Sequence, residues 1–392
     1  MKNISVIAVT YNRPESLKRL LLSLNRSFYE ENVVDLIISI DKSKAERKII
    51  EISEQFEWKY GNKIIRTFPQ RQGLRQHILQ CGDYTESYDA VIVFEDDIIA
   101  AENYYKYVSQ ALDFYESDDR IGGISLYSPH INQMATRPFT PINTDSDVFF
   151  IQYAQSWGQC WSKRMWSEFK KWYKDNDGDI KPENDIPIVL TRWANSSWLK
   201  YYMKFIIKTN KYFVYPYVSL SSNTSEKGEH NVSSSNMYQV SMLYGKHNYN
   251  FCTLDDGIKY DVFLENQGLA KYLDSNIVDS ELCIDLYGIK SNNNNRRYIL
   301  TRRNLNYTKM RSYGLRMRPH DANIIYGASG DDIHLYDTGN NNLLDLPKKT
   351  NILQDSMYYS LLSWKLLLTA GFYSFFEAVK YKVLMKIRKI MK

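Results

Sequence analysis

Three consecutive acidic residues, Glu95, Asp96 and Asp97, follow the apolar run 90–94. Such a run is typical of a buried strand, and ligands of α/β sheets bind beyond the carboxyl ends of these strands. Three carboxylates at one strand end repel one another unless positive charge lies among them. A hard divalent cation is usually held by one or two carboxylates and the phosphate oxygens of a substrate. The group therefore predicts a metal-bound diphosphate; the alternative is a solvated turn whose acids cap the next helix.

Polar residues also end two other predicted strands. Arg13 follows the strand 4–10, which ends at Thr10, and its guanidinium offers paired donors that match phosphate oxygens. The alternative is an ordinary surface arginine at a helix start, where a positive charge is mildly unfavourable. Asp41 closes the strand 34–40 and can accept a hydrogen bond from a nucleobase or cap the following helix. We expect Thr10, Arg13 and Asp41 to contact the same ligand.

Two further segments carry candidate binding residues. Gly73 lets the backbone approach a ligand, and Arg71 and Arg75 on either side are placed to hold a diphosphate or sugar. The alternative there is a turn with solvated charges. Trp157 and Trp161 predict a wall for a sugar or acceptor ring, whereas a packed aromatic core is the alternative for one of the pair.

One histidine, His230, lies in the segment 219–235, which is rich in serine and asparagine. A loop of this composition suggests a closing lid, from which the imidazole would contact phosphate or metal. The alternative is an incidental loop histidine.

The elements that must position these residues alternate along the chain. Strands are predicted at 4–10, 34–40, 63–67, 89–94 and 121–126, and helices at 44–56, 73–81 and 103–115, with another that Pro14 opens. This order predicts a parallel sheet with helices on both faces. Beyond it, strands are predicted at 148–152 and 212–218, and helices at 162–173 and 198–209.

Composition limits the class of protein. Of the 392 residues, 44% are hydrophobic and 24% charged, which is typical of a globular protein, and the net charge is +5. The four cysteines are scattered, which disfavours a zinc knuckle or disulfide framework and favours a reducing compartment. The first apolar run reads as a strand rather than a signal peptide, and no run of about twenty apolar residues predicts a membrane span. No nucleic-acid partner is expected.

The last thirty residues differ from the rest. The apolar stretch 361–376 is followed by six lysines and arginines and one acid, Glu377. This pattern predicts an amphipathic helix on an anionic membrane surface, with a helix packed on its own domain as the alternative. We therefore predict a catalytic domain at 1–235, an extension of unknown role at 236–350 and a basic amphipathic helix at 351–392.

Taken together, these residues resemble the GT-A glycosyltransferases. The opening at 6–14, Val-Ile-Ala-Val-Thr-Tyr-Asn-Arg-Pro, looks like the start of family 2. The stretch at 93–98, Val-Phe-Glu-Asp-Asp-Ile, is similar to the Glu-Asp-Asp form of the Asp-X-Asp motif in the N-acetylglucosaminyltransferase I-like group. The resemblance covers about residues 1–235. It implies a Rossmann-like, mostly parallel α/β sheet with helices on both faces, to which the chain adds a C-terminal α+β extension and the terminal helix.

The resemblance also implies roles for the residues of the motifs. Asp97 would coordinate Mn²⁺ or Mg²⁺ on the diphosphate, while Glu95 and Asp96 would contact ribose or the donor sugar. Asp41 would hold the base and Arg13 the nucleotide phosphates. The segment from Trp157 to Trp161 would form part of the donor and acceptor wall.

One departure from the related groups concerns the general base. They carry an acidic residue at the start of the helix after the tryptophan segment, whereas Trp193–Trp198 has no carboxylate. An inverting transfer needs a base to take the proton of the acceptor hydroxyl. Among the nearby acids, Glu183 and Asp185 are our candidates for this catalytic role; otherwise the base lies elsewhere or the activity is lost.

These features together predict a metal-dependent, inverting glycosyltransferase that moves a hexosyl or N-acetylhexosaminyl group from a nucleotide-diphosphate sugar to a glycan or lipid-linked acceptor. The setting expected is the inner face of the cytoplasmic membrane, in bacterial surface polysaccharide synthesis. One alternative is a catalytically inactive glycan-binding or scaffold protein. Another is a sugar nucleotidyltransferase, which would need a glycine-rich loop where Tyr11 and Asn12 stand.

Overall fold

The computed structural model describes residues 2–30, 33–226, 236–291, 295–339 and 358–360, and the helical positions 368, 371–372, 375–376, 379 and 382. His230 and most of the predicted terminal helix lie outside the described residues. No helix among those described is both long enough and apolar enough to cross a bilayer.

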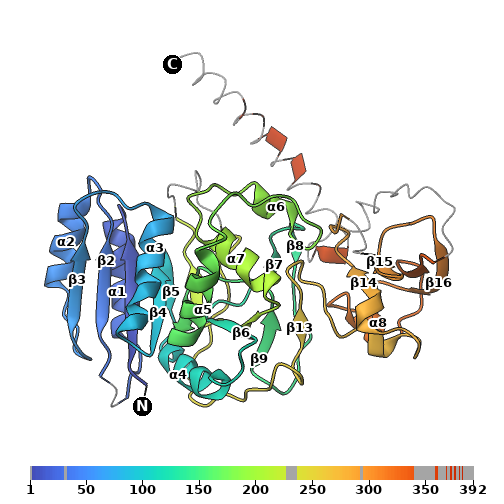
Figure 1. The fold of residues 1–392 in the computed structure, drawn as a ribbon, viewed down its shortest axis with the longest axis horizontal. Helices are drawn as coiled ribbons and strands as arrows, with labels where there is room; N and C mark the ends of the chain where they lie inside the picture. Colours follow the sequence, from blue (N-terminus) through green and yellow to red (C-terminus); the bar gives the residue numbers. More distant parts are fainter. Residues whose placement is uncertain are drawn as a thin grey trace.

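A nine-stranded sheet forms the centre of the larger part of the molecule (Figure 1). Its spatial order is β13-β9-β11-β6-β10-β4-β1-β2-β3. Most neighbouring strands are parallel, but β10 runs antiparallel to β4 and β6, and β9 runs antiparallel to β11. The strands are β1 (Ile4–Thr10), β2 (Leu36–Ile40), β3 (Lys63–Thr67), β4 (Ala90–Glu95), β6 (Ile121–Ser125), β9 (Val148–Ile151), β10 (Gln159–Ser162), β11 (Tyr212–Pro216) and β13 (Lys259–Tyr260).

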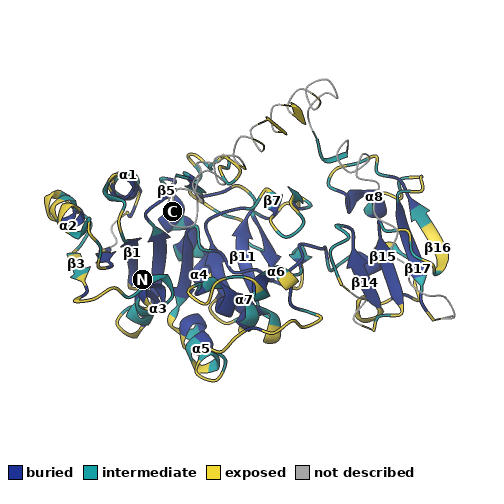
Figure 2. Ribbon diagram, turned by 90° about the horizontal axis from the view of Figure 1, so that it is seen from above, coloured by how far each residue is buried: buried dark blue, intermediate teal, exposed yellow. Residues whose placement is uncertain are grey.

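Helices cover both faces of this sheet, and Figure 2 shows α1 on one side with α3 and α5 on the other. Helix α1 begins at Pro14 and buries leucines 17, 20, 21 and 24, which follow the helical repeat. Helix α5 begins after Ser162, whose side chain accepts a hydrogen bond from the Met165 N–H. The helices are α1 (Pro14–Asn25), α2 (Glu46–Gln55), α3 (Leu74–Gly82), α4 (Tyr104–Tyr115), α5 (Lys163–Tyr173), α6 (Ile188–Thr191), α7 (Leu199–Lys208) and α8 (Ala322–Ile325). The predicted fold class is confirmed.

Two short strand pairs lie outside the large sheet. Strand β5 (Ile98–Ala100) pairs with β12 (Ser221–Asn223), and β7 (Ile131–Asn132) pairs with β8 (Arg137–Pro138). The first pair matters for the site because the Thr224 N–H donates to the Asp97 carbonyl at 2.8 Å. It thereby fixes a segment from late in the chain beside Glu95, Asp96 and Asp97, which we call the acidic group.

A second, four-stranded sheet with its own apolar core lies at the end of the molecule farthest from β3 (Figure 1). We call residues 269–339, which contain it, the C-terminal module. Its order is β14-β15-β17-β16, with β14 (Leu282–Asp285), β15 (Tyr298–Thr301), β16 (Thr308–Tyr313) and β17 (Ile333–Asp337). The core of the large sheet continues to Leu264, and that of the module begins at Leu269. The predicted domain boundary at residue 235 stays a prediction.

Candidate functional site

A cavity of about 380 Å³ lies at the carboxyl ends of β1, β2 and β4. These strands are neighbours and run parallel, so their last residues meet at one edge of the sheet. Six predicted residues line the cavity from the strand ends: Thr10, Arg13, Asp41, Glu95, Asp96 and Asp97. Arg71 and Trp157 line it from loops. The structure thus brings together residues that are far apart in the sequence; their roles stay predictions.

Arg13 supplies positive charge to the acidic group. Its Nη1 lies 3.2 Å from Asp97 Oδ2, and its Nη2 is paired with Asp96 Oδ1. The Thr10 hydroxyl donates to Asp96 Oδ2 at 2.7 Å. Asp96 and Asp97 are only 3% and 8% exposed, so these contacts occur where water screens charge poorly. The charge that the carboxylates require is therefore supplied in part by the chain itself.

One guanidinium does not balance three carboxylates. Burial, together with the charges of Asp97 and Asp96, raises the pKa of Glu95 to about 8. Burial also raises the pKa of Asp96 to about 6, against the lowering effect of Arg13. The group therefore remains short of positive charge.

The acidic group fits a divalent cation in one respect. Asp97 Oδ1 is buried and has no hydrogen-bond partner, which is uncommon for a carboxylate oxygen. Within the described part of the chain, no group of three or more histidine, cysteine, aspartate or glutamate side chains is arranged to hold a metal. Asp97 Oδ1 suits a cation that takes its other ligands from substrate phosphates.

Asp41 is engaged by the loop that follows β3. Its Oδ1 accepts from the N–H groups of Lys42 and Gln72 at 2.8 and 2.7 Å, and its Oδ2 accepts from the Gly73 N–H at 2.9 Å. Gly73 has φ = 75°, a conformation that side chains disfavour. Asp41 therefore fixes this loop, and the base contact stays a prediction.

The two arginines that flank Gly73, Arg71 and Arg75, lie in different places. The Arg71 guanidinium lies over the Tyr11 ring, 4.6 Å from its centroid, and both residues line the cavity. Arg75 does not line it and instead donates to the Tyr201 hydroxyl at 2.9 Å. Residue 75 is in the first turn of α3, which turns its side chain toward α7.

The two predicted wall residues, Trp157 and Trp161, also lie in different environments. Trp157 is half-buried at the cavity, with Tyr127 and Tyr238 rings 4.8 Å away. Trp161 is fully buried on β10 and packs against Trp166 and Tyr202. The packed-core alternative therefore holds for Trp161, because it lies on β10 and packs against rings of α5 and α7, whereas Trp157 precedes the strand.

The two candidate bases are not in the cavity as the structure stands. Lys208 pairs with Glu183 at 2.6 Å and with Asp185 at 3.0 Å. Neither carboxylate lines this cavity, and Asp185 instead lines a second cavity near β13. Their catalytic role stays a prediction that requires a movement of this segment.

Sequence reasoning missed Glu226 and Tyr238, which line the cavity. Glu226 accepts from Ser16 at 2.7 Å and from Arg19 at 2.7 and 2.9 Å, and Arg19 lowers its pKa. These contacts join residues more than 200 positions apart, so no local sequence pattern predicts them.

Comparison with known proteins agrees with this geometry. Residues 5–176 match the family model described as glycosyl transferase family 2. This segment is similar to glycosyl transferase family 2. The predicted resemblance and the predicted enzyme class, a glycosyltransferase, are thereby confirmed. The match includes β1, β2 and β4, whose ends form the cavity.

Solved structures give weaker likenesses. TarS from S. aureus, solved in complex with UDP-GlcNAc, is 16% identical over 60% of this chain and 62% of that one, with a TM-score of 0.37. The mannosyltransferase PcManGT from Pyrobaculum calidifontis, solved with GDP-Man and Mn²⁺, is 9% identical over 55% and 57%, with a TM-score of 0.33. GalNAc-T7, solved with UDP, GalNAc and Mn²⁺, is 14% identical over 55% and 42%, with a TM-score of 0.38.

In each case the match spans less than two thirds of the solved chain. No curated protein sequence matches this chain. The family assignment therefore rests on the family model.

Proposed function

We propose that the protein is a metal-dependent, inverting glycosyltransferase that uses a nucleotide-diphosphate sugar and a glycan or lipid-linked acceptor. The observation that carries the proposal is the unpartnered Asp97 Oδ1 in a cavity at the sheet edge, within the segment that matches family 2. A diphosphate with its cation would supply the positive charge that the acidic group still lacks.

In the proposed reaction, Asp97 holds Mn²⁺ or Mg²⁺ and Arg13 binds a phosphate of the donor. When bound, the cation neutralises the charge that develops on the leaving diphosphate. Arg71 and Tyr11 form one wall of the cavity, and the exposed part of the Trp157 indole offers a flat apolar surface to a sugar ring. These residues bind and orient the donor so that its anomeric carbon faces the acceptor.

The acceptor hydroxyl must lose a proton as the new bond forms. We keep Glu183 and Asp185 as candidate bases, released from Lys208 when the acceptor binds. Because neither residue lines the cavity, one competitor is a glycan-binding protein of the same fold without activity. Slow hydrolysis of the bound donor, which needs no acceptor, separates the two.

We further propose a peripheral place on an anionic, inner membrane face, in the synthesis of a bacterial surface polysaccharide. Leu368, Phe372, Phe375 and Phe376 are 56–66% exposed, at spacings that put them along one side of a helix. Basic residues follow them in the sequence. Exposed aromatic side chains next to lysines suit the headgroup region of an anionic bilayer.

The proposed function is tested by thermal shift and donor hydrolysis with UDP- and GDP-sugars, with and without Mn²⁺. We expect one donor to raise Tm only when Mn²⁺ is present, and to be hydrolysed slowly. Binding without hydrolysis would favour the inactive binding protein, and the absence of metal-dependent binding for every donor would exclude the proposal.

A further inference from the structure

A second cavity, of about 570 Å³, lies where β13 of the large sheet approaches β14 of the C-terminal module (Figure 1). It is larger than the cavity at the acidic group and falls within the size range of small-molecule sites. Strand β13 is five strands away from β4, which corresponds to about 24 Å at the usual strand spacing. The second cavity is therefore separate from the donor site.

Side-chain amides form a continuous hydrogen-bonded row along this cavity. The Tyr212 hydroxyl donates to Gln267 Oε1 at 2.5 Å, and Gln267 Nε2 donates to Gln152 Oε1 at 3.5 Å. Gln152 Nε2 in turn donates to Asn210 Oδ1 at 2.7 Å. All four residues line the cavity. Each amide has donors and acceptors beyond those used in the row, which a ligand in the cavity can meet.

The charges around the cavity are nearly balanced. Among the described residues that line it, four are basic, namely Arg120, Lys259, Lys290 and Arg296, and four are acidic, namely Asp185, Asp261, Glu265 and Asp279. A site for a phosphate would show an excess of basic groups, and a site for a cation an excess of carboxylates. The lining thus favours a neutral, polar ligand.

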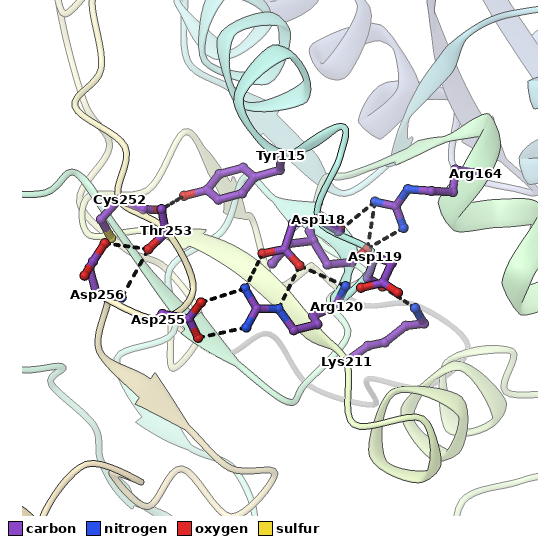
Figure 3. Close-up of polar contacts among 11 residues, drawn as sticks. Tyr115, Asp118, Asp119, Arg120, Arg164, Lys211, Cys252, Thr253, Asp255 and Asp256 are labelled. Atoms are coloured by element: carbon purple, nitrogen blue, oxygen red, sulfur yellow. Dashed lines mark hydrogen bonds and ion pairs between the residues drawn. The ribbon is translucent and has the colours of Figure 1, made fainter.

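Several of these charges are already paired in the wall. Arg120 is clamped between Asp118 and Asp255, with contacts of 2.8–3.0 Å (Figure 3). Lys290 donates to Asp261 at 2.6 Å. These pairs engage charges of the lining within the protein itself, which further favours a neutral ligand.

Glu265 gives the cavity an unsatisfied acceptor. The residue is 1% exposed; its Oε1 accepts from the Tyr287 N–H at 2.8 Å, whereas its buried Oε2 has no hydrogen-bond partner. Native structures leave few such atoms unpaired. Burial raises the pKa of this carboxyl, which suits it to a hydroxyl group more than to a cation.

We propose that this cavity binds a neutral saccharide. Sugar hydroxyls both donate and accept hydrogen bonds, so they can pair with the amide row and with Glu265 Oε2. The further role that we assign, holding the distant part of an extended acceptor glycan, rests on the proposed function. Saccharide binding itself does not.

The test measures saccharide binding by the full chain without nucleotide or metal. Maltotetraose, cellotetraose, chitotetraose and mannotetraose are screened by saturation-transfer NMR, and affinities are measured by calorimetry. We expect at least one to bind. Ser280→Trp, an exposed change at the cavity lining, should weaken that binding about tenfold, while Ser275→Trp, equally exposed on the same segment but outside the lining, should leave it unchanged.

A second variant addresses the buried acceptor. Glu265→Gln places an amide near the Oε2 position and should also weaken binding about tenfold, with folding checked by circular dichroism. The proposal is overturned if none of the four sugars binds, if Ser280→Trp binds as the unaltered chain does, or if UDP with Mn²⁺ displaces the sugar. Asp97→Asn should retain saccharide binding, so failure at the donor site is distinguishable from failure here.

Discussion

The Arg13 guanidinium lies 3.2 Å from Asp97 Oδ2, and the same side chain also pairs with Asp96. One arginine therefore contacts both aspartates of the acidic group. A diphosphate that enters with its cation would compete for both partners, since its oxygens attract the guanidinium and its cation attracts the carboxylates. Arg13 is thus expected to exchange partners when the donor binds.

Replacement of Arg13 tests this exchange. Arg13→Gln should weaken nucleotide binding about tenfold because a charge-assisted contact to phosphate is lost. The same change should strengthen the binding of Mn²⁺ alone, because the carboxylates lose their internal counter-charge. Calorimetry with UDP and with Mn²⁺ separately measures both effects. Arg26→Gln, an exposed arginine after α1, is the matched control, and an unchanged Mn²⁺ affinity in Arg13→Gln would contradict the exchange.

Asp97→Asn tests the metal itself. The amide keeps the size of the side chain but removes the charge that would hold the cation, so the Mn²⁺-dependent rise in Tm with donor should disappear. Asp175→Asn, an exposed aspartate after α5, should behave like the unaltered chain. Undiminished metal-dependent donor binding by Asp97→Asn would show that Asp97 does not hold the cation.

His77 should contribute a loss of stability in mild acid, which the raised pKa values of Glu95 and Asp96 oppose because these carboxyls take up protons in the folded state. Burial lowers the pKa of its imidazole to about 4, and Nε2 lies 2.7 Å from the Ser39 hydroxyl. Between about pH 6.5 and 4 the unfolded chain binds a proton that the folded chain does not, so the free energy of unfolding decreases as the pH falls. The contribution lost by pH 4 is about 3 kcal/mol.

Urea unfolding at pH 7.5 and pH 5 measures this effect. His77→Gln should lose less stability between the two values than the unaltered chain, whereas the exposed His247→Gln should lose as much. Equal losses for all three proteins would show that His77 does not carry the dependence.

The general base is tested by a pair of variants. If Glu183 or Asp185 takes the acceptor proton, Glu183→Gln or Asp185→Asn should lower kcat at least a hundredfold with the donor affinity unchanged. Since both acids pair with Lys208, a change in Tm alone would reveal only the loss of an ion pair. Full activity in both variants would exclude Glu183 and Asp185 as the general base.

The terminal segment is tested by sedimentation with vesicles. The full chain should sediment with vesicles of phosphatidylglycerol and phosphatidylcholine, and less so in high salt. The chain ending at Ser360 should remain in the supernatant. Pure phosphatidylcholine vesicles serve as the control, and equal sedimentation of the two chains would argue against the membrane role.

The sequence was informative where apolar runs and helical repeats are strong. Strands β1 and β3 lie at the predicted residues 4–10 and 63–67, and α5 begins one residue after its predicted start. Strand β10 was missed because Gln-Cys-Trp-Ser is too short for an alternating pattern, and its tryptophan suggested a binding wall.

The grouping of the strand-end residues was predictable for a related reason. Residues at strand ends, such as Arg13 and Asp97, meet because the parallel sheet brings those ends together. Other side chains, such as Arg75 in the first turn of α3 and Glu226 in a loop, depend on contacts that only the folded chain creates. Sequence spacing therefore brought the strand-end residues, Arg71 and Trp157 to one cavity, whereas it misplaced Arg75 and missed Glu226.

The place of β11 in the large sheet has a practical consequence for shortened versions of the protein. The matched segment ends at residue 176, yet β11, at Tyr212–Pro216, lies between β6 and β9. A chain cut at 176 would lack β11, so β6 and β9 would each expose backbone N–H and C=O groups without partners. Unpaired strand edges of this kind promote aggregation. The smallest fragment worth expressing therefore ends beyond Leu264, the last buried residue in the core of the large sheet.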